Sequence, residues 1–195
     1  MKQRIVIVRH GESAANAGSA ATTPFSEIPL TEKGKVEAQE YSKSVNEKPD
    51  LIICSSFLRA KQTSQPLRDK FPDVPFEINN DIHEFAYLNP DLCIGTTVQE
   101  RRQRVIDFWA KQDPSYQDCD STESFAQFVA RAKSFLVYVH QKEERHIIVF
   151  SHFLFMKLLE LIIDNPNDSD LELMKKYPEY KETKDIKNCG TIEIP

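Results

Sequence analysis

The sequence alternates short, apolar, β-branched runs with longer stretches of helical periodicity. Runs of the first kind are "QRIVIV" at 3–8, "DLIICSS" at 50–56 and "HIIVF" at 146–150. Their apolar character is typical of strands that are covered on both faces. Helical patterns between them, at 31–45 and 123–139 for example, supply the covering layers. The alternation therefore predicts an α/β fold, a three-layer α/β/α sandwich with a mostly parallel central sheet.

Two shorter apolar runs predict further strands of the same sheet. "PFEI" at 75–78 predicts a third strand, and "GTIEI" at 190–194 predicts a last strand at an edge of the sheet. Residues 17–30 have the composition of a loop, and residues 79–95 have no regular pattern.

Capping residues and proline predict where the helices begin and end. Thr31 is expected to cap the helix that runs to about Val45, and Asp120 followed by Glu123 resembles a capping pair for the later helix. A helix from Phe57 is expected to kink or end at Pro66.

One further helix, at 153–163, is apolar nearly all round, so it is expected to be buried on more than one side. A helical segment at 97–111 belongs to residues 85–120, which we expect to form a cap insertion over this helix and the site. A dimer contact is the alternative. Residues 1–195 are expected to form a single domain.

Charge and cysteine content exclude several function classes. The net charge of −5 speaks against nucleic-acid binding and against a polybasic membrane anchor. The longest apolar run is interrupted by Lys157 and Glu160 and is too short to span a bilayer. The four cysteines form no C-x-x-C pair, and the N-terminus shows no leader pattern, so we expect free thiols and a cytoplasmic protein.

Polar side chains follow three of the predicted strands at the point where each strand ends. Arg9 and His10 follow the first, Arg59 lies one turn beyond the second, and His152 follows the strand at 146–150. Each alone would be an ordinary polar residue. Because the carboxyl ends of parallel strands share one edge of the sheet, we expect all four to converge there. Guanidinium groups beside neutral imidazoles suit a phosphate.

Helix ends support the same interpretation. Arg59 is expected in the first turn of a helix, where the helix dipole opposes a cation. An anion held between the helix start and the guanidinium removes that conflict. His152 is also expected at a helix start, which favours its neutral form unless an anion is bound.

Several motifs together resemble one known family. "RHGES" at 9–13, with Asn16 following, resembles the signature of the histidine phosphatase superfamily, in its phosphoglycerate-mutase-like branch. The order and spacing of further blocks agree from residue 5 to about 160. These blocks are "IPLTEKGKVEAQ" at 28–39, "SSFLRAKQT" at 55–63, "IHEF" at 82–85, "ESFAQFVARA" at 123–132 and "VFSH" at 149–152.

The resemblance implies phosphoryl transfer through a phosphohistidine, with no metal and no cofactor. His10 would be the nucleophile, and Glu84 would protonate the leaving oxygen and then activate water. Charge on the phosphoryl group would be stabilised by three residues, with Asn16 as an added neutral donor. These three are Arg9, Arg59 and His152. Gly11 would permit a close backbone turn beside the substrate.

Some assignments stay open at this level. Glu12 is the rival of Glu84 for the acid role, since it also lies near His10. Phe153 stands where the family usually has glycine, and its ring either lines the substrate pocket or packs in the core. The same question applies to Phe85 and Tyr87, with the core favoured.

Two further residues are interpreted as ordinary. His83 departs from the family's usual arginine, and we interpret it as a surface histidine rather than a substrate contact. Cys54 lies in an apolar strand and is interpreted as inert core.

The sequence thus predicts a phosphomonoester hydrolase. A mutase-type phosphotransferase is the alternative, disfavoured because the insertions and tail typical of the glycolytic mutases are not recognised. A non-catalytic phosphoprotein-binding module is a third reading, against which the retained His10 and Glu84 speak. The expected partner is a small phosphorylated substrate or a phosphoprotein, bound by a monomer or homodimer. Specificity is expected from residues 17–27 and 85–120.

Overall fold

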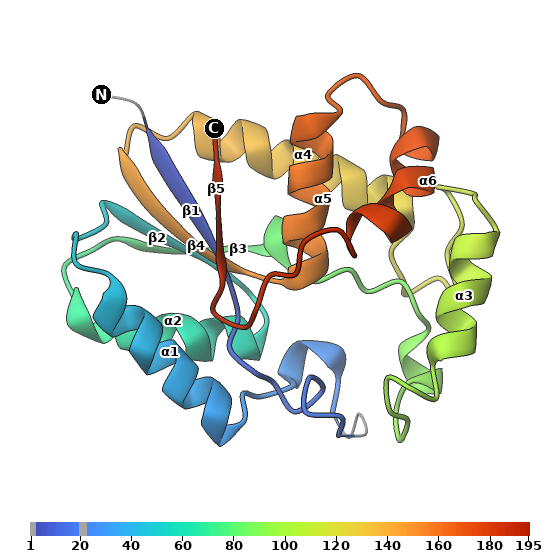
Figure 1. Cartoon of the computed structure of the whole chain (residues 1–195), viewed down its shortest axis with the longest axis horizontal. Coiled ribbons are helices and arrows are strands. Elements are labelled where there is room, and N and C mark those ends of the chain that lie inside the picture. The colour runs from blue at the N-terminus through green and yellow to red at the C-terminus, as the bar shows by residue number, and fades with distance from the viewer. Residues whose placement is uncertain (1–2, 20–22) are drawn as a thin grey trace.

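The computed structural model describes residues 3–19 and 23–195 of the chain. Part of the predicted 17–30 loop, residues 20–22, lies outside the described residues. Five strands form one sheet in the order β3-β2-β4-β1-β5 (Figure 1). The strands are β1 (Arg4–Arg9), β2 (Leu51–Ser55), β3 (Phe76–Asn79), β4 (His146–Ser151) and β5 (Thr191–Ile194). The first four run parallel, and β5 pairs antiparallel with β1 at the edge, as the sequence predicts.

Helices cover both faces of this sheet. The helices are α1 (Glu32–Ser44), α2 (Leu58–Lys70), α3 (Arg102–Ala110), α4 (Phe125–His140), α5 (Phe153–Asp164) and α6 (Asp170–Tyr180). Short 3₁₀ turns occur at Phe25–Glu27, Asn80–Ile82 and Pro90–Leu92. Figure 1 shows α1 and α2 on one side of the sheet and α4 and α5 on the other, so the three-layer sandwich is confirmed.

Alternate residues of each strand enter the two cores because side chains alternate across a sheet. Ile5 and Ile7 of β1 pack with the layer of α4 and α5, whereas Val6 and Val8 pack with the layer of α1 and α2. The central strands are therefore apolar on both faces, which is the reason why they appear as continuous apolar runs in the sequence. Cys54 is fully buried in β2, as expected for an inert core residue.

Two predicted helix boundaries are wrong. The pair Asp120 and Glu123 does not cap α4: Ser124 is the N-cap, and it forms a reciprocal capping box with Gln127. Glu123 is instead in an ion pair with Arg131. The early end expected at Pro66 does not occur either, since α2 contains Pro66 and continues to Lys70; the kink given as its alternative stays a prediction.

α6 was not predicted from the sequence, yet it is the element that packs on α5. Tyr177 of α6 is fully buried, and its hydroxyl donates to the Leu154 carbonyl at 2.7 Å. α5 is thus buried between the sheet, α4 and α6, which confirms the expectation that it is covered on more than one side.

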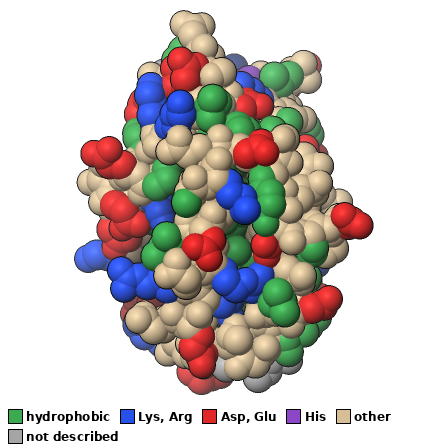
Figure 2. All heavy atoms as spheres, turned by 90° about the vertical axis from the view of Figure 1, so that its right-hand side faces the viewer, with side chains coloured by type: hydrophobic (Ala, Val, Ile, Leu, Met, Phe, Trp, Pro, Cys, Tyr) green, Lys and Arg blue, Asp and Glu red, His purple; other side chains and the backbone are tan. Residues whose placement is uncertain are grey.

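Residues 85–120 pack beside this layer through aromatic rings. Phe85 is stacked on Phe128 of α4 at 4.2 Å between ring centroids, and Trp109 of α3 is stacked on Tyr177 at 5.5 Å. Tyr87 packs against the same cluster, so the core reading of Phe85 and Tyr87 is confirmed. The outer face of this region carries acidic, basic and hydrophobic side chains interspersed (Figure 2).

This aromatic cluster predicts a large stability effect at Phe128. We expect Phe128→Ala to lower the free energy of unfolding by about 3–5 kcal/mol, because it removes a buried ring between Phe85 and Phe155. Val137→Ala on the same helix is the control, since Val137 is 58% exposed and should cost less than about 0.5 kcal/mol. Urea unfolding of both variants measures the difference, and equal losses would contradict the packing described.

Candidate functional site

The site begins with the pairing of two neighbouring strands. β1 and β4 are parallel and in register, with Arg9 opposite Ser151, and the His10 N–H donates to the Ser151 carbonyl at 3.0 Å. The residue after each strand end is a histidine. His10 and His152 therefore lie side by side, with ring centroids 5.2 Å apart, as the sequence predicts.

β2 brings the third strand end to the same edge. Ser55 at its end lies 2.8 Å from His152 through Oγ and Nε2. Arg59 in the first turn of α2 donates from Nε to His10 Nε2 at 3.2 Å. The convergence predicted for the strand ends is thus observed for His10, Arg59 and His152.

The hydrogen bonds of His10 define its protonation. Nδ1 lies 2.7 Å from the Gly11 carbonyl, which only accepts, so Nδ1 carries the proton. Nε2 faces an arginine N–H and is therefore the atom with the free electron pair. Burial, and then the charges of Arg59 and Arg9, lower the pKa of His10 well below 6.5. The imidazole is neutral, with a nucleophilic nitrogen at a defined position.

His152 is fully buried, and burial followed by the Arg59 charge lowers its pKa well below 6.5. Its Nδ1 is buried and has no hydrogen-bond partner among the described residues; the same is true of Arg9 Nε. Buried polar atoms nearly always have a partner, and Trp109 Nε1 and His146 Nδ1 also lack one among the described residues. His152 Nδ1 and Arg9 Nε are the two of these nitrogens that belong to predicted site residues.

Arg9 is held from two sides. Its Nη1 donates to the Ile186 carbonyl at 2.5 Å, and its guanidinium lies over the Phe153 ring at 4.9 Å. Burial lowers the pKa of Arg9. Phe153, the residue in place of the usual glycine, is partly buried and packs against the core while supporting this arginine.

Glu84 is almost completely buried at the start of α5. Its Oε1 accepts from the N–H groups of Phe85 at 3.0 Å and Phe155 at 3.3 Å, and its Oε2 accepts from Leu154 at 3.2 Å. The carboxylate thus satisfies free N–H groups at a helix N-terminus. Burial nevertheless raises the pKa of Glu84 above its usual 4.5, against the lowering effect of Arg59 and the N–H donors.

A second arginine positions the segment that carries Glu84. Arg131 of α4 donates from Nη1 to the carbonyls of Asp81 at 2.5 Å and His83 at 2.8 Å, while Glu123 holds the same guanidinium in an ion pair. Sequence reasoning assigned Arg131 no role. One arginine on the polar side of an amphipathic helix gives no signal that distinguishes it from a solvated one.

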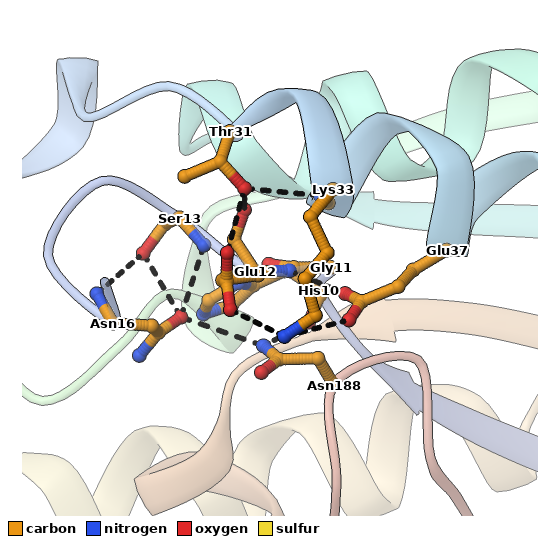
Figure 3. Close-up of polar contacts among 10 residues, drawn as sticks. His10, Gly11, Glu12, Ser13, Asn16, Thr31, Lys33, Glu37 and Asn188 are labelled. Atoms are coloured by element: carbon orange, nitrogen blue, oxygen red, sulfur yellow. Dashed lines mark hydrogen bonds and ion pairs between the residues drawn. The ribbon is translucent and has the colours of Figure 1, made fainter.

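Glu12, the rival acid, is committed elsewhere. Its Oε1 accepts from Thr31 Oγ1 at 2.9 Å, and its Oε2 pairs with Lys33 Nζ at 2.6 Å (Figure 3). The hydrogen bonds from Lys33 and Thr31 lower the pKa of Glu12, so it is ionised and has no proton to give.

Gly11 contributes by close approach of the backbone. A Cβ at Gly11 would lie 2.5 Å from the Gly34 carbonyl oxygen, and a Cβ at Gly34 would lie 2.1 Å from the Glu12 carbonyl oxygen. The two glycines let the loop after β1 cross the first turn of α1. Gly11 is expected in a close turn beside the substrate; its N–H donates to Thr63 Oγ1 at 3.0 Å.

Asn16 lies at the exposed side of the same loop. Its Oδ1 accepts from the Ser13 N–H at 3.1 Å and the Ser13 hydroxyl at 3.0 Å. Its amide nitrogen has no acceptor among the described residues.

His83 is not an ordinary surface residue. Its ring is partly buried and stacked on Phe57 at 5.3 Å, and Phe57 in turn contacts His152 edge-on at 5.2 Å. His83 also lines an open hollow of about 420 Å³. The other lining residues are Ala86, Ser121, Thr122, Glu123, Gln127 and Arg131.

The geometry can be compared with known proteins. The sequence profile of the histidine phosphatase superfamily (branch 1) matches residues 5–174, so the chain belongs to that superfamily. A phosphoglycerate mutase-like protein AT74H of Arabidopsis thaliana is 51% identical over 47 residues, which are 23% of this chain and 17% of that protein. A 2,3-bisphosphoglycerate-dependent phosphoglycerate mutase of the same plant is 41% identical over 61 residues, which are 31% of this chain and 18% of the mutase. The matches thus span less than a fifth of these relatives.

Solved structures share the fold over nearly the whole chain. The α-ribazole-5′-phosphate phosphatase of Escherichia coli superposes with a TM-score of 0.68 at 21% identity, covering 90% of this chain and 85% of that one. A phosphoserine phosphatase of Entamoeba histolytica gives 0.71 at 20% identity, covering 98% and 89%. A mycobacterial glucosyl-3-phosphoglycerate phosphatase gives 0.72 at 17% identity, covering 98% and 89%.

The described part of the chain holds no group of three His, Cys, Asp or Glu side chains arranged to bind a metal ion. None of its helices has the length and apolar character needed to cross a membrane.

The buried histidines predict a dependence of stability on pH. Both have pKa values well below 6.5 in the folded protein, so unfolding takes up protons at acid pH. We expect the free energy of unfolding to be highest above pH 6.5 and to fall as pH drops below it. His10→Asn should reduce that slope by up to about 1.4 kcal/mol per pH unit. Urea unfolding from pH 7.5 to 5 measures both slopes, and equal slopes would show that His10 titrates alike in both states.

Proposed function

We propose that this protein is a phosphomonoester hydrolase that acts through a phosphohistidine on His10 Nε2, without a metal. The observation that carries the proposal is the state of His10: a neutral ring, its Nδ1 proton bound to the Gly11 carbonyl and its Nε2 electron pair facing the Arg59 guanidinium. A nucleophile of this kind needs no base. The superfamily membership supports the same chemistry.

In the first step His10 Nε2 attacks phosphorus, and the bond from phosphorus to the ester oxygen breaks. Arg59 donates to Nε2 in the ligand-free site, so its hydrogen bond must pass to a phosphoryl oxygen as the substrate binds. Burial lowers the pKa of Arg59 to about 10, because no anion neutralises it fully there. The two unsatisfied nitrogens, Arg9 Nε and His152 Nδ1, supply further donors if His152 is protonated at Nδ1.

We propose a tautomer of His152 in which Nε2 is the acceptor. Ser55 Oγ accepts from the Phe57 N–H at 3.3 Å and lies 2.8 Å from His152 Nε2, to which it can donate its hydrogen. The proton of the neutral ring is then on Nδ1.

Glu84 gives its proton to the leaving oxygen and, in the second step, takes one from the water that attacks phosphorus. The nitrogen–phosphorus bond then breaks and phosphate leaves. The raised pKa of Glu84 supports the acid role, since burial favours the protonated form. Oε2, with one N–H donor against two for Oε1, is the less engaged oxygen and the better carrier of the proton.

The substrate is proposed to be a small phosphomonoester or a phosphoprotein. The hollow beside His83 lies one ring beyond the Phe57–His152 contact and offers hydroxyl and amide groups to a polar leaving group. All four cysteines are free, which supports action in a reducing compartment such as the cytoplasm.

A panel of phosphomonoesters tests the proposed function. It should include phosphoserine, 3-phosphoglycerate, α-ribazole-5′-phosphate and p-nitrophenyl phosphate. We expect phosphate release by the wild type and loss of nearly all activity in His10→Ala, with a circular dichroism spectrum like the wild type. His140→Ala, which changes an exposed histidine of α4, is the matched control and should remain active.

Other outcomes separate the alternatives. No phosphate release from any substrate near neutral pH would overturn the hydrolase and leave a phosphate-binding module. Transfer of the phosphoryl group between positions of phosphoglycerate, in place of its release to water, would identify a mutase.

The role of Glu84 predicts a pH profile. With phosphoserine, kcat/KM should fall as rising pH ionises Glu84, at a pH above 4.5 because burial raises its pKa. Glu84→Gln should lower kcat/KM by about 10²–10⁴-fold and flatten the profile in that range. With p-nitrophenyl phosphate, whose leaving group needs no proton, the loss should be small and phosphohistidine should accumulate. If Glu84→Gln keeps the wild-type kcat/KM with phosphoserine, the acid role would instead belong to Glu12.

A further inference from the structure

The segment before β5 lies against the catalytic strand end, although it is distant in sequence. The Arg9 N–H donates to the Gly190 carbonyl at 2.9 Å, and the Cys189 N–H donates to the Arg9 carbonyl at 3.1 Å. The Ile186 carbonyl accepts from the Arg9 guanidinium. Arg9 is therefore bound to residues 186–190 through both its main chain and its side chain.

Asn188 is the side chain of this segment that enters the hydrogen-bond network around His10. Its Nδ2 donates to the His10 carbonyl at 3.0 Å and to Asn16 Oδ1 at 3.4 Å (Figure 3). The same Asn16 oxygen accepts from the N–H and hydroxyl of Ser13. One acceptor atom thus joins the loop after β1 to the segment before β5.

These contacts allow one orientation of each amide. The Ser13 N–H can only donate, so the Asn16 atom that faces it is the oxygen. Asn188 faces that oxygen and the His10 carbonyl oxygen, so it must present its nitrogen. The nitrogen of Asn16 points away from Ser13 and Asn188 in Figure 3, and no acceptor for it occurs among the described residues.

We propose that Asn188 is a positioning residue for phosphate binding: together with Ser13 it holds the Asn16 amide with its oxygen bound by protein and its nitrogen free for an anion. The inference rests on the proposed function, in which Asn16 donates to the phosphoryl group. Asn16 is exposed and belongs to a loop, so its amide has no packing to hold it. A phosphoryl oxygen only accepts, and an amide turned over would present the wrong atom to it.

Asn188→Ala removes both donor hydrogen bonds without changing the charge. We expect the inhibition constant of inorganic phosphate and the KM for substrate to rise about fivefold, the effect of one typical hydrogen bond. kcat should change less. Asn188→Gln, which keeps an amide donor, should recover part of the loss. Asn46→Ala is the matched control, because Asn46 is exposed beyond the end of α1 and should leave both constants unchanged.

A double-mutant cycle separates positioning from mere structural support. In an Asn16→Ala background, Asn188→Ala should weaken phosphate inhibition by less than about twofold, because no amide remains to be oriented. Equal losses in the two backgrounds, or none in either, would overturn the inference. If Asn188→Ala does not fold, as judged by its thermal unfolding, Asn188→Ser replaces it in the cycle.

The two proposals fail in different ways. A wild type that releases no phosphate from any ester overturns the hydrolase. An active wild type whose Asn188 variants bind phosphate normally overturns only the positioning role.

Discussion

The parallel, in-register pairing of β1 with β4 is the constraint on which the site depends. It places Arg9 opposite Ser151, so the residues that follow, His10 and His152, meet at one edge. A shift of one residue would move the alternating side chains of β1 to opposite cores, because Ile5 and Ile7 face one layer and Val6 and Val8 the other. The packing of the two cores therefore sets the register, and the register sets the distance between the histidines.

Burial then decides the protonation of the groups brought together. Removing His10 and His152 from water beside Arg59 keeps both imidazoles neutral, whereas the same burial favours a protonated Glu84. The proposed mechanism needs a nucleophile without a proton and an acid with one. Burial away from water favours both, whereas the Arg59 charge favours only the neutral histidines and lowers the pKa of Glu84. The α5 N-terminus also limits the effect of burial on Glu84, since its N–H groups stabilise the carboxylate and keep it available as a base.

The sequence predicted those parts of the molecule whose signal is local. Strand runs, the α4 stripe and the strand-end residues His10, Arg59 and His152 could be located because periodicity and parallel-sheet geometry determine their positions. The hydrogen-bond partners of polar side chains could not be located in this way. Nothing near Arg131 indicates that it holds the Asp81 and His83 carbonyls, and nothing near Asn188 indicates its contact with His10.

Errors in the prediction had the same origin. Asp120 and Glu123 have the spacing of a capping pair. The capping box of α4 is instead formed by Ser124 and Gln127, and Glu123 is in an ion pair with Arg131. α6 contains Pro178 and has mixed polarity, so its helical signal was weak; the packing of Tyr177 on α5 compensates for that.

Arg59 is a buried cation whose charge is satisfied by neutral partners. Its guanidinium lies against the rings of Phe25 and Phe57, and it donates to the Phe25 carbonyl at 2.8 Å and to His10 Nε2. A buried cation without such partners would be costly, so these contacts satisfy it until a phosphoryl group arrives. All of these partners are neutral, so a phosphate dianion would bind the guanidinium more strongly than any of them. In the proposed mechanism, binding of substrate would thus draw Arg59 away from Nε2 and free the electron pair for attack on phosphorus.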